Sequence, residues 1–202
     1  MIVTDIKQLR KKCEPCSSVE EGEEIGAKLL KELGSKGVGL AANQIGINKR
    51  VCVINVKEPI VLVNPVIVEK SPELFAFAEG CLSFPNDGVT TIRHKSLTIT
   101  ADNHTGKLHF GVWQENNEDG YNKEDKLNYA LETACVQHEI DHLDGITMFE
   151  REFKSEPLVR GKNAPVKIGR NEKVTITKGS ESKVLKYKKA QPMLEDGWTL
   201  SI

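Results

Sequence analysis

The stretch His138-Glu139-Ile140-Asp141-His142 is the strongest structural signal in this chain of 202 residues. In an α-helix, residues four positions apart lie on the same face, one turn from each other. Two imidazoles at this spacing can bind one divalent cation, and a glutamate beside the first imidazole can act as general base on a water at that cation. The stretch therefore predicts a helix that carries a catalytic metal site.

The sequence on either side of this stretch predicts a long helix among short strands. The helix is expected to start near Asn122, with Asp125 as a weak capping partner, to reach about Leu143 and to end at Gly145. A second, amphipathic helix is expected over residues 19–34. Segments rich in Val and Ile predict strands at 50–56, 60–68 and 74–78, and a hairpin of 97–101 with 107–112. Strands gathered around one helix are typical of an α+β fold.

A catalytic site of this kind needs a third protein ligand and one open position. No histidine follows His142, and the downstream carboxylates Asp144, Glu150 and Glu152 lack a recognisable second helix at the spacing of known peptidases. The missing ligand is therefore expected upstream, where residues 79–83 read Glu-Gly-Cys-Leu-Ser.

Three segments in this order resemble the signature motifs of peptide deformylases: GVGLAANQ at 37–44, EGCLS at 79–83 and HEIDH at 138–142. The resemblance covers most of residues 1–153. It implies an α+β fold in which small antiparallel or mixed sheets surround the central helix. It also implies an enzyme that removes the N-formyl group from the N-terminal formyl-methionine of nascent polypeptides and releases formate.

The resemblance assigns the metal ligands. Cys81 matches the thiolate ligand of the family, beside His138 and His142. A thiolate with two imidazoles suits Fe(II) as well as zinc, and the resemblance implies Fe(II) in the cell, with Zn or Ni as possible substitutes.

The resemblance also assigns the reacting groups. Glu139 matches the acid and base that activates water and then protonates the leaving amine. Gln44 and the backbone N–H of Leu82 match the two donors to the formyl oxygen, where negative charge develops. Val38 and Cys135 are expected to line the pocket for the methionine side chain. Gly39 lets the substrate backbone lie close to the main chain.

Three further residues are expected to hold the ligands in place, namely Glu79, Arg93 and Asp141, with an ion pair between Glu79 and Arg93. The chain also departs from the family pattern. Many members carry an arginine shortly after the CLS segment, whereas this chain has none before Arg93. The polar stretch 114–126, expected to be a loop near the site entrance, is longer than the resemblance suggests.

Charge divides the chain into two expected domains. Residues 1–153, the expected catalytic domain, carry 17 basic and 24 acidic residues, whereas residues 154–202 carry 11 basic and 5 acidic ones. The second part is expected to be a polar linker over 154–170 followed by a β-hairpin of 173–177 with 183–187. It is interpreted as a solvated tail or as a docking arm for an anionic partner such as ribosomal RNA.

Composition limits the compartment and the alternative functions. No apolar stretch reaches the length of a membrane helix, and the start lacks the features of a signal peptide, so a cytoplasmic monomer is expected. Two alternatives to a deformylase stay open. One is an endopeptidase with a downstream third ligand, and the other is a structural zinc site with Cys135 as a fourth ligand.

Overall fold

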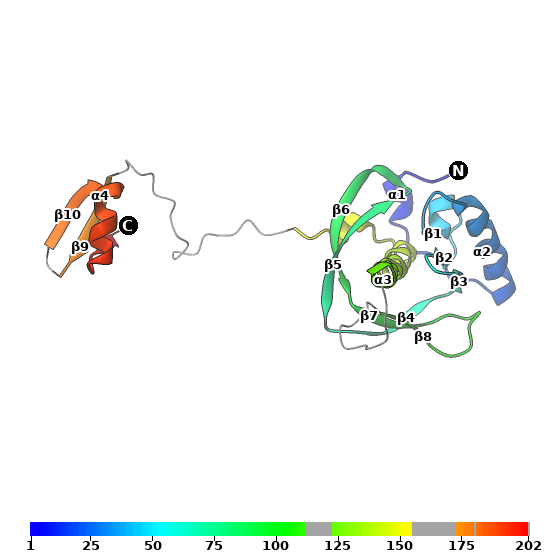
Figure 1. Cartoon of the computed structure of the whole chain (residues 1–202). Coiled ribbons are helices and arrows are strands. Elements are labelled where there is room, and N and C mark those ends of the chain that lie inside the picture. The colour runs from blue at the N-terminus through cyan, green and yellow to red at the C-terminus, as the bar shows by residue number, and fades with distance from the viewer. Residues whose placement is uncertain (112–122, 155–172, 180, 202) are drawn as a thin grey trace. The chain divides into compact units, whose positions relative to one another are not determined.

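The computed structural model of the chain describes residues 1–111, 123–154, 173–179 and 181–201 (Figure 1). The chain divides into two compact units, Met1–Lys154 and Ser155–Ile202. Residues 114–122 of the expected loop 114–126 lie outside the residues that the structure describes, whereas residues 123–126 form the start of a helix instead of a loop. The expected capping pair at Asn122 and Asp125, and residues 155–170 of the expected linker 154–170, also lie outside the described residues or side chains. Within the described residues, no helix is long and apolar enough to cross a membrane.

Helix α3, Lys123–Leu143, lies at the centre of the first unit (Figure 1). Every residue from Glu132 to Leu143 is buried, including the polar ones, because strands surround this part of the helix on all sides. The helix ends two residues before Gly145, whose φ of 73° is the left-handed conformation that terminates helices. The expected central helix and the α+β fold class are confirmed.

One three-stranded antiparallel sheet presents the glycine-rich segment to α3. Its strands are β1 (Gly39–Ala41), β2 (Val51–Asn55) and β3 (Pro59–Val63), and β1 forms one edge. The helical turn η1, Ala42–Ile45, follows β1 directly. Helix α2, Val19–Leu33, packs on β3 so closely that a Cβ on Gly22 would lie 2.3 Å from the Val63 side chain.

The expected strand 60–68 is wrong as a single element. The chain leaves β3 at Asn64, which has a φ of 51°, and Pro65 follows. Pro65 has no backbone N–H to donate to a ladder. The second half of the expected strand becomes β4 (Val66–Lys70) of a different antiparallel sheet, with β7 (Ser96–Thr100) and β8 (Leu108–Gly111). The expected hairpin of 97–101 with 107–112 is present as β7 and β8.

A long two-stranded hairpin delivers the thiol to the helix. Strand β5 runs over Leu74–Cys81, three residues beyond its expected end, and pairs with β6, Phe84–His94. Strand β6 was not predicted, because its first half contains Pro, Asn, Asp and Gly and is largely exposed. Short helical turns, α1 (Ile6–Leu9) and η2 (Met148–Arg151), complete the first unit.

The second unit has its own core and a mixture of strands and one helix. The expected hairpin is present as β9 (Lys173–Lys178) and β10 (Glu181–Lys186). Helix α4 (Tyr187–Glu195) and strand β11 (Thr199–Ser201) were not predicted. The strand order is β10-β9-β11, and Figure 1 shows α4 beside the β9–β10 hairpin. Four residues form the buried core: Val174, Ile176, Ala190 and Trp198.

Candidate active site

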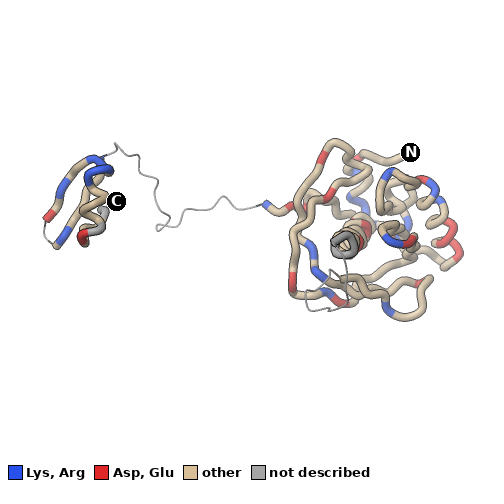
Figure 2. The backbone as a smooth tube through the Cα atoms, viewed as in Figure 1, with Lys and Arg blue, Asp and Glu red and all other residues tan. Residues whose placement is uncertain are grey.

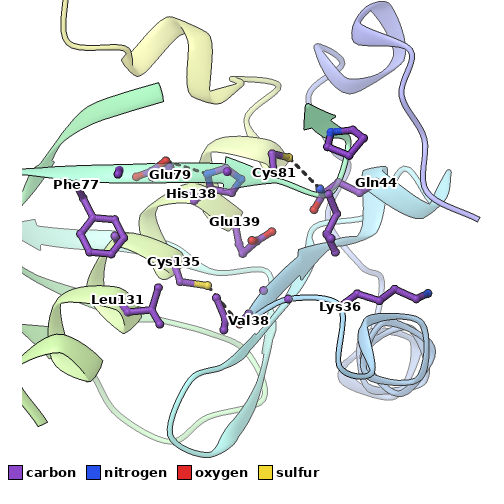
Figure 3. Close-up of a pocket in the computed structure, with 17 residues that line it drawn as sticks. Lys36, Val38, Gln44, Phe77, Glu79, Cys81, Leu131, Cys135, His138 and Glu139 are labelled. Atoms are coloured by element: carbon purple, nitrogen blue, oxygen red, sulfur yellow. Dashed lines mark hydrogen bonds and ion pairs between the residues drawn. The ribbon is translucent and has the colours of Figure 1, made fainter. Parts of the chain in front are cut away.

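A cavity of about 370 Å³ is lined by residues of β1, β5 and α3 and by the segments next to them (Figure 3). One part of its wall is apolar, and Val38 and Cys135 belong to this part. The polar part contains Gln44, Cys81 and Glu139. Other lining residues were not predicted from the sequence, among them Lys36, Phe77, Leu131, Ala134 and Pro85. The cavity therefore joins an apolar pocket to a group of reactive side chains.

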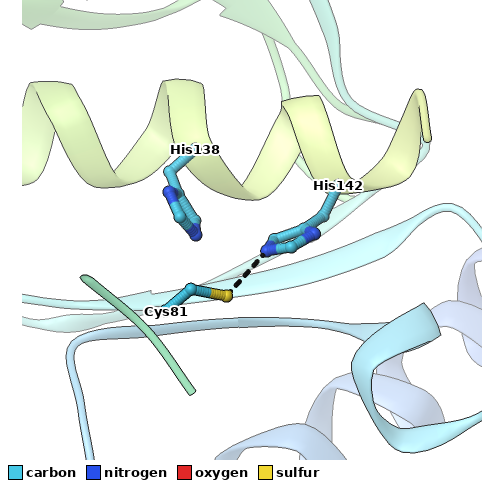
Figure 4. Close-up of side chains that lie close together, drawn as sticks. All are labelled: Cys81, His138 and His142. Atoms are coloured by element: carbon cyan, nitrogen blue, oxygen red, sulfur yellow. Dashed lines mark hydrogen bonds between the residues drawn. The ribbon is translucent and has the colours of Figure 1, made fainter. Parts of the chain in front are cut away.

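Three buried donor groups converge beside this cavity (Figure 4). Cys81 lies at the end of β5, and His138 and His142 lie one turn apart on α3. Their donor atoms all lie within 4.8 Å of one another, and Cys81 Sγ is 3.2 Å from His142 Nε2. The register of β5 and β6 shifts between Gly80 and Cys81, an irregularity that re-aims a side chain at the end of a ladder. One sulfur and two nitrogens in this arrangement fit a divalent metal.

The charges around His138 also fit a cation. Glu79 Oε2 lies 3.0 Å from His138 Nδ1, which leaves Nε2 directed to the cluster. Burial opposes a charged imidazole, but hydrogen bonds to Cys81 and Glu79 outweigh it and raise the pKa of His138 to about 10. The surroundings thus stabilise positive charge at this point of the site. Burial and the charge on His138 lower the pKa of His142, which favours its neutral imidazole.

Glu79 is itself held by a buried network. Arg93 Nε and Nη2 donate to its two carboxylate oxygens at 2.6 and 2.8 Å, and Thr91 Oγ1 donates at 2.7 Å. Burial favours the neutral acid, but the hydrogen bonds and charges of Arg93 and His138 outweigh it and lower the pKa of Glu79 to about 2. Glu79 is therefore an anion that orients His138.

The network continues to Asp141 and beyond it to a residue that was not predicted. Arg93 Nη1 donates to Asp141 Oδ2 at 2.5 Å. Arg151, on η2, donates to both oxygens of Asp141 at 2.8 and 3.1 Å. The order of contacts is Arg151, Asp141, Arg93, Glu79 and His138. Sequence reasoning missed Arg151 because nothing in its neighbourhood distinguishes it from other surface arginines.

Glu139 lies between strand β1 and the group of donors that contains Cys81 and His138 (Figure 3). Its side chain is buried, and Oε2 has no hydrogen-bond partner within the described residues. Burial raises the pKa of Glu139 to about 7, a value at which a carboxyl group can both accept and donate a proton near neutral pH. A Cβ on Gly39 would lie 2.5 Å from Glu139 Oε1 and 2.5 Å from Cys135 Sγ, so only glycine fits there without a shift.

The amide of Gln44 has a defined orientation. Its Oε1 accepts a hydrogen bond from the backbone N–H of Ala41 at 2.9 Å. The Nε2 group therefore points the other way, toward Ser83 Oγ at 3.2 Å and Cys81 Sγ at 3.4 Å. Leu82 lies next to Cys81 and lines the cavity. The structure thus directs the Gln44 amide group toward Cys81, and both Gln44 and Leu82 line the cavity.

Comparisons with known proteins match this fold and site. The family model described as polypeptide deformylase matches residues 1–157. A peptide deformylase of Prochlorococcus marinus strain NATL2A is 32% identical over 160 residues, which cover 74% of this chain and 72% of the relative. A peptide deformylase of Bartonella tribocorum is 37% identical over 147 residues, which cover 68% of this chain and 74% of the relative.

Solved structures give the same result. The crystal structure of peptide deformylase from Thermotoga maritima matches with a TM-score of 0.64 at 28% identity, over 76% of this chain and 97% of that one. A probable peptide deformylase from Synechococcus phage S-SSM7 matches with a TM-score of 0.60 at 33% identity, over 75% and 98%. The chain therefore belongs to the polypeptide deformylase family of hydrolases, which remove the N-formyl group from nascent polypeptides.

Proposed function

We propose that Cys81, His138 and His142 bind one divalent cation and that Glu139 moves the protons of the deformylation reaction. The observation that carries the proposal is the position of the Glu139 carboxyl group. It is buried beside three convergent metal-type donors, at the end of a pocket with an apolar wall. The expected metal in the cell is Fe(II), because one thiolate and two imidazoles suit this ion, and Zn or Ni fits the same donors.

A divalent cation bound to these donors supplies Lewis-acid chemistry, which lowers the pKa of water at the site and polarises the formyl carbonyl. Glu139 accepts the proton of the attacking water as the oxygen–carbon bond forms. It then delivers this proton to the nitrogen as the carbon–nitrogen bond breaks. The products are formate and a free N-terminal amine. A pKa near 7 suits both steps.

The Gln44 amide and the backbone N–H of Leu82 are the proposed donors to the formyl oxygen. Negative charge develops on this oxygen in the transition state, and one such donor is typically worth about 3 kcal/mol. The hydrogen bond from Ala41 to Gln44 Oε1 supports this role, because it fixes which end of the amide faces Cys81.

The apolar wall of the cavity is the proposed binding site for the methionine side chain. Val38, Leu131 and Cys135 supply apolar and sulfur-containing surface, which suits a flexible thioether. Gly39 is proposed to let the substrate backbone approach β1, which is an edge strand of its sheet.

The two alternatives have less support. An endopeptidase needs a downstream ligand, but Asp144 pairs with Arg50 at 2.7 Å, and Glu150 Oε2 accepts a hydrogen bond from the backbone N–H of Thr147 at 2.9 Å. A closed structural zinc site needs Cys135, but its thiol donates to the Val38 carbonyl at 3.4 Å instead of joining the cluster.

The proposed substrate places the enzyme at the site of protein synthesis. We propose that it acts as a cytoplasmic monomer, with residues 1–153 as the catalytic domain. The segment 154–202 has a net positive charge, opposite to that of the first part of the chain. We propose that this segment associates with the ribosome, whose RNA is negatively charged.

The test is anaerobic purification with metal analysis, followed by measurement of formate release from formyl-Met-Ala-Ser. We expect about one metal per chain and robust turnover in the wild type. Glu139→Gln should keep the metal and lose at least about 100-fold in rate. A wild-type protein that holds the metal but turns over no formylated peptide would refute the proposal.

A further inference from the structure

The lysines of the second unit fall into two groups. Two of them have partners: Lys178 Nζ donates to the Asp196 carbonyl at 2.6 Å, and Lys183 Nζ lies 3.7 Å from Glu181 and 4.4 Å from the Trp198 ring centre. Within residues 173–179 and 181–201, the four remaining lysines are exposed and form no ion pair with any side chain that the structure describes. These four, which we call the lysine pole, are Lys173, Lys186, Lys188 and Lys189.

The lysine pole occupies one end of the unit. Lys173 starts β9 and lies directly opposite Lys186, the last residue of β10. Lys186 is also the N-cap residue of α4, and Lys188 and Lys189 lie in the first turn of that helix. The acidic partners lie at the other end, where Glu181 faces Lys178 across the β9–β10 turn. In Figure 2 the red segments of this unit lie at the end away from the start of α4, where a further blue segment also lies.

This arrangement is unfavourable for the isolated unit. Like charges directly opposite each other destabilise a strand pair. Cations in the first turn of a helix add to the positive end of its macrodipole, and the first turn of α4 contains no acidic residue. The four lysine side chains are exposed and do not belong to the buried core of the unit, which includes Val174 and Trp198. The packing of this core therefore does not explain why lysines occupy these positions. A polyanion lying across this end of the unit would offset the repulsion.

We propose that the lysine pole binds the phosphate backbone of RNA. The choice of RNA rests on the proposed function, because a nascent polypeptide emerges from a particle made largely of RNA. Lysine ammonium groups act as point charges on phosphates and do not read bases. Tyr187, the aromatic residue next to the lysine pole, packs against the core of the unit and so is not offered to a base for stacking. The binding is therefore independent of base sequence.

Four phosphate contacts set the expected salt dependence. The logarithm of the binding constant falls with the logarithm of salt concentration with a slope of about −0.7 to −0.9 per contact. Affinity should thus fall by roughly 50- to 150-fold between 50 and 200 mM salt if all four lysines contact phosphates.

The test measures fluorescence anisotropy of a labelled 30-nucleotide RNA hairpin titrated with the full chain. The variant K173Q/K186Q/K188Q/K189Q should lose at least about 10-fold in affinity at 100 mM salt, and its salt slope should fall by about 3. The milder variant K188Q/K189Q should lose about half of that slope, which keeps the test decisive if the quadruple variant unfolds.

The matched control removes four exposed lysines of the first unit with the same change in net charge, K12Q/K28Q/K31Q/K95Q. It should bind RNA within about threefold of the wild type. Equal losses in both variants would overturn the lysine pole in favour of a net-charge effect, as would unchanged binding by K188Q/K189Q. Tighter binding to vesicles with 30% phosphatidylserine than to RNA would also overturn the proposal that the lysine pole binds RNA. A duplex DNA of equal length, titrated in the same way, distinguishes a preference for RNA from general binding of phosphates.

This result is independent of catalysis. The lysine pole variants should release formate from formyl-Met-Ala-Ser at the wild-type rate. Loss of RNA binding with full turnover supports the lysine pole, whereas a wild type without turnover refutes the proposed function and leaves the RNA measurement valid.

Discussion

Replacement of Gly39 by alanine is expected to displace the proposed catalytic carboxylate, Glu139, without removing the proposed metal ligands. The new Cβ would lie 2.5 Å from Glu139 Oε1 and from Cys135 Sγ, whereas ordinary contacts begin at 3.4 Å. Because Gly39 lies in strand β1, its backbone cannot easily retreat, so the Glu139 carboxyl group must move by about 0.9 Å. A misplacement of about 1 Å at a reacting group can cost about 100-fold in rate, or about 2.7 kcal/mol of transition-state stabilisation.

The assay is formate release from formyl-Met-Ala-Ser, with metal content measured on the same preparations. We expect kcat/KM of G39A to fall about 100-fold at unchanged metal content. G88A is the control, because a Cβ on Gly88 of β6 would meet only the Glu79 backbone oxygen, at an ordinary 3.6 Å. G39A/C135A, compared with C135A, relieves the contact with sulfur but not the contact with Glu139, so the loss should persist. Full activity of G39A would refute the steric reasoning, and loss of metal would show that the effect passes through the ligands instead.

Three other perturbations test separate parts of the structure. Cys81→Ala should strip most of the metal at equal protein concentration, as measured by elemental analysis, and full metal retention would point to a different third ligand. Arg151→Ala should raise the dissociation constant of the metal about 10-fold in a chelator competition, because it leaves Asp141 to be held by Arg93 alone, and R151K should recover part of this loss. In Glu21, hydrogen bonds from Ser17 lower the pKa to about 2, below the ordinary 4.5, so its stabilising effect is complete above pH 4.5 and disappears as the pH falls toward 2. The difference in Tm between the wild type and E21Q should therefore shrink as the pH falls from 6 to 3, and a constant difference would contradict this assignment.

The sequence was most informative where one local pattern carries the geometry. The spacing of His138 and His142 fixes two donors on one helical face, so the helix and half of the cluster follow from periodicity alone. Cys81 lies 57 residues before His138, and no local rule connects them. Only the resemblance of the EGCLS segment pointed to this thiol. The physical connection is the β5–β6 hairpin, whose register shift directs Cys81 toward α3.

The elements that sequence reasoning missed depend on contacts between distant segments. Strand β6 begins with residues of low strand propensity, and its pairing with β5 runs from Gly88 to His94 and resumes at Phe84. This pairing between two segments of the chain, not the propensity of the first residues, makes β6 a strand. The break at Asn64 was hidden inside a run of Val and Ile, and it depends on hydrogen bonds that Asn64 exchanges with the backbone of Cys16. Helix α4 contains Pro192, which argues against a helix in a local reading, but the core around Trp198 stabilises it.

The buried charges of the first unit form a paired network next to the proposed metal site. Two arginines and two carboxylates alternate from Arg151 through Asp141 and Arg93 to Glu79, so their charges cancel before the network reaches His138. Buried charges are costly unless they are paired and hydrogen-bonded. The carboxylates of Asp141 and Glu79 each form an ion pair with an arginine and accept hydrogen bonds from it. The groups that remain beside the two imidazoles are the Cys81 sulfur and the Glu139 carboxyl group. The network can therefore orient the proposed ligand His138 without adding net charge to the cluster, and we expect the donor atoms themselves to decide which metal binds.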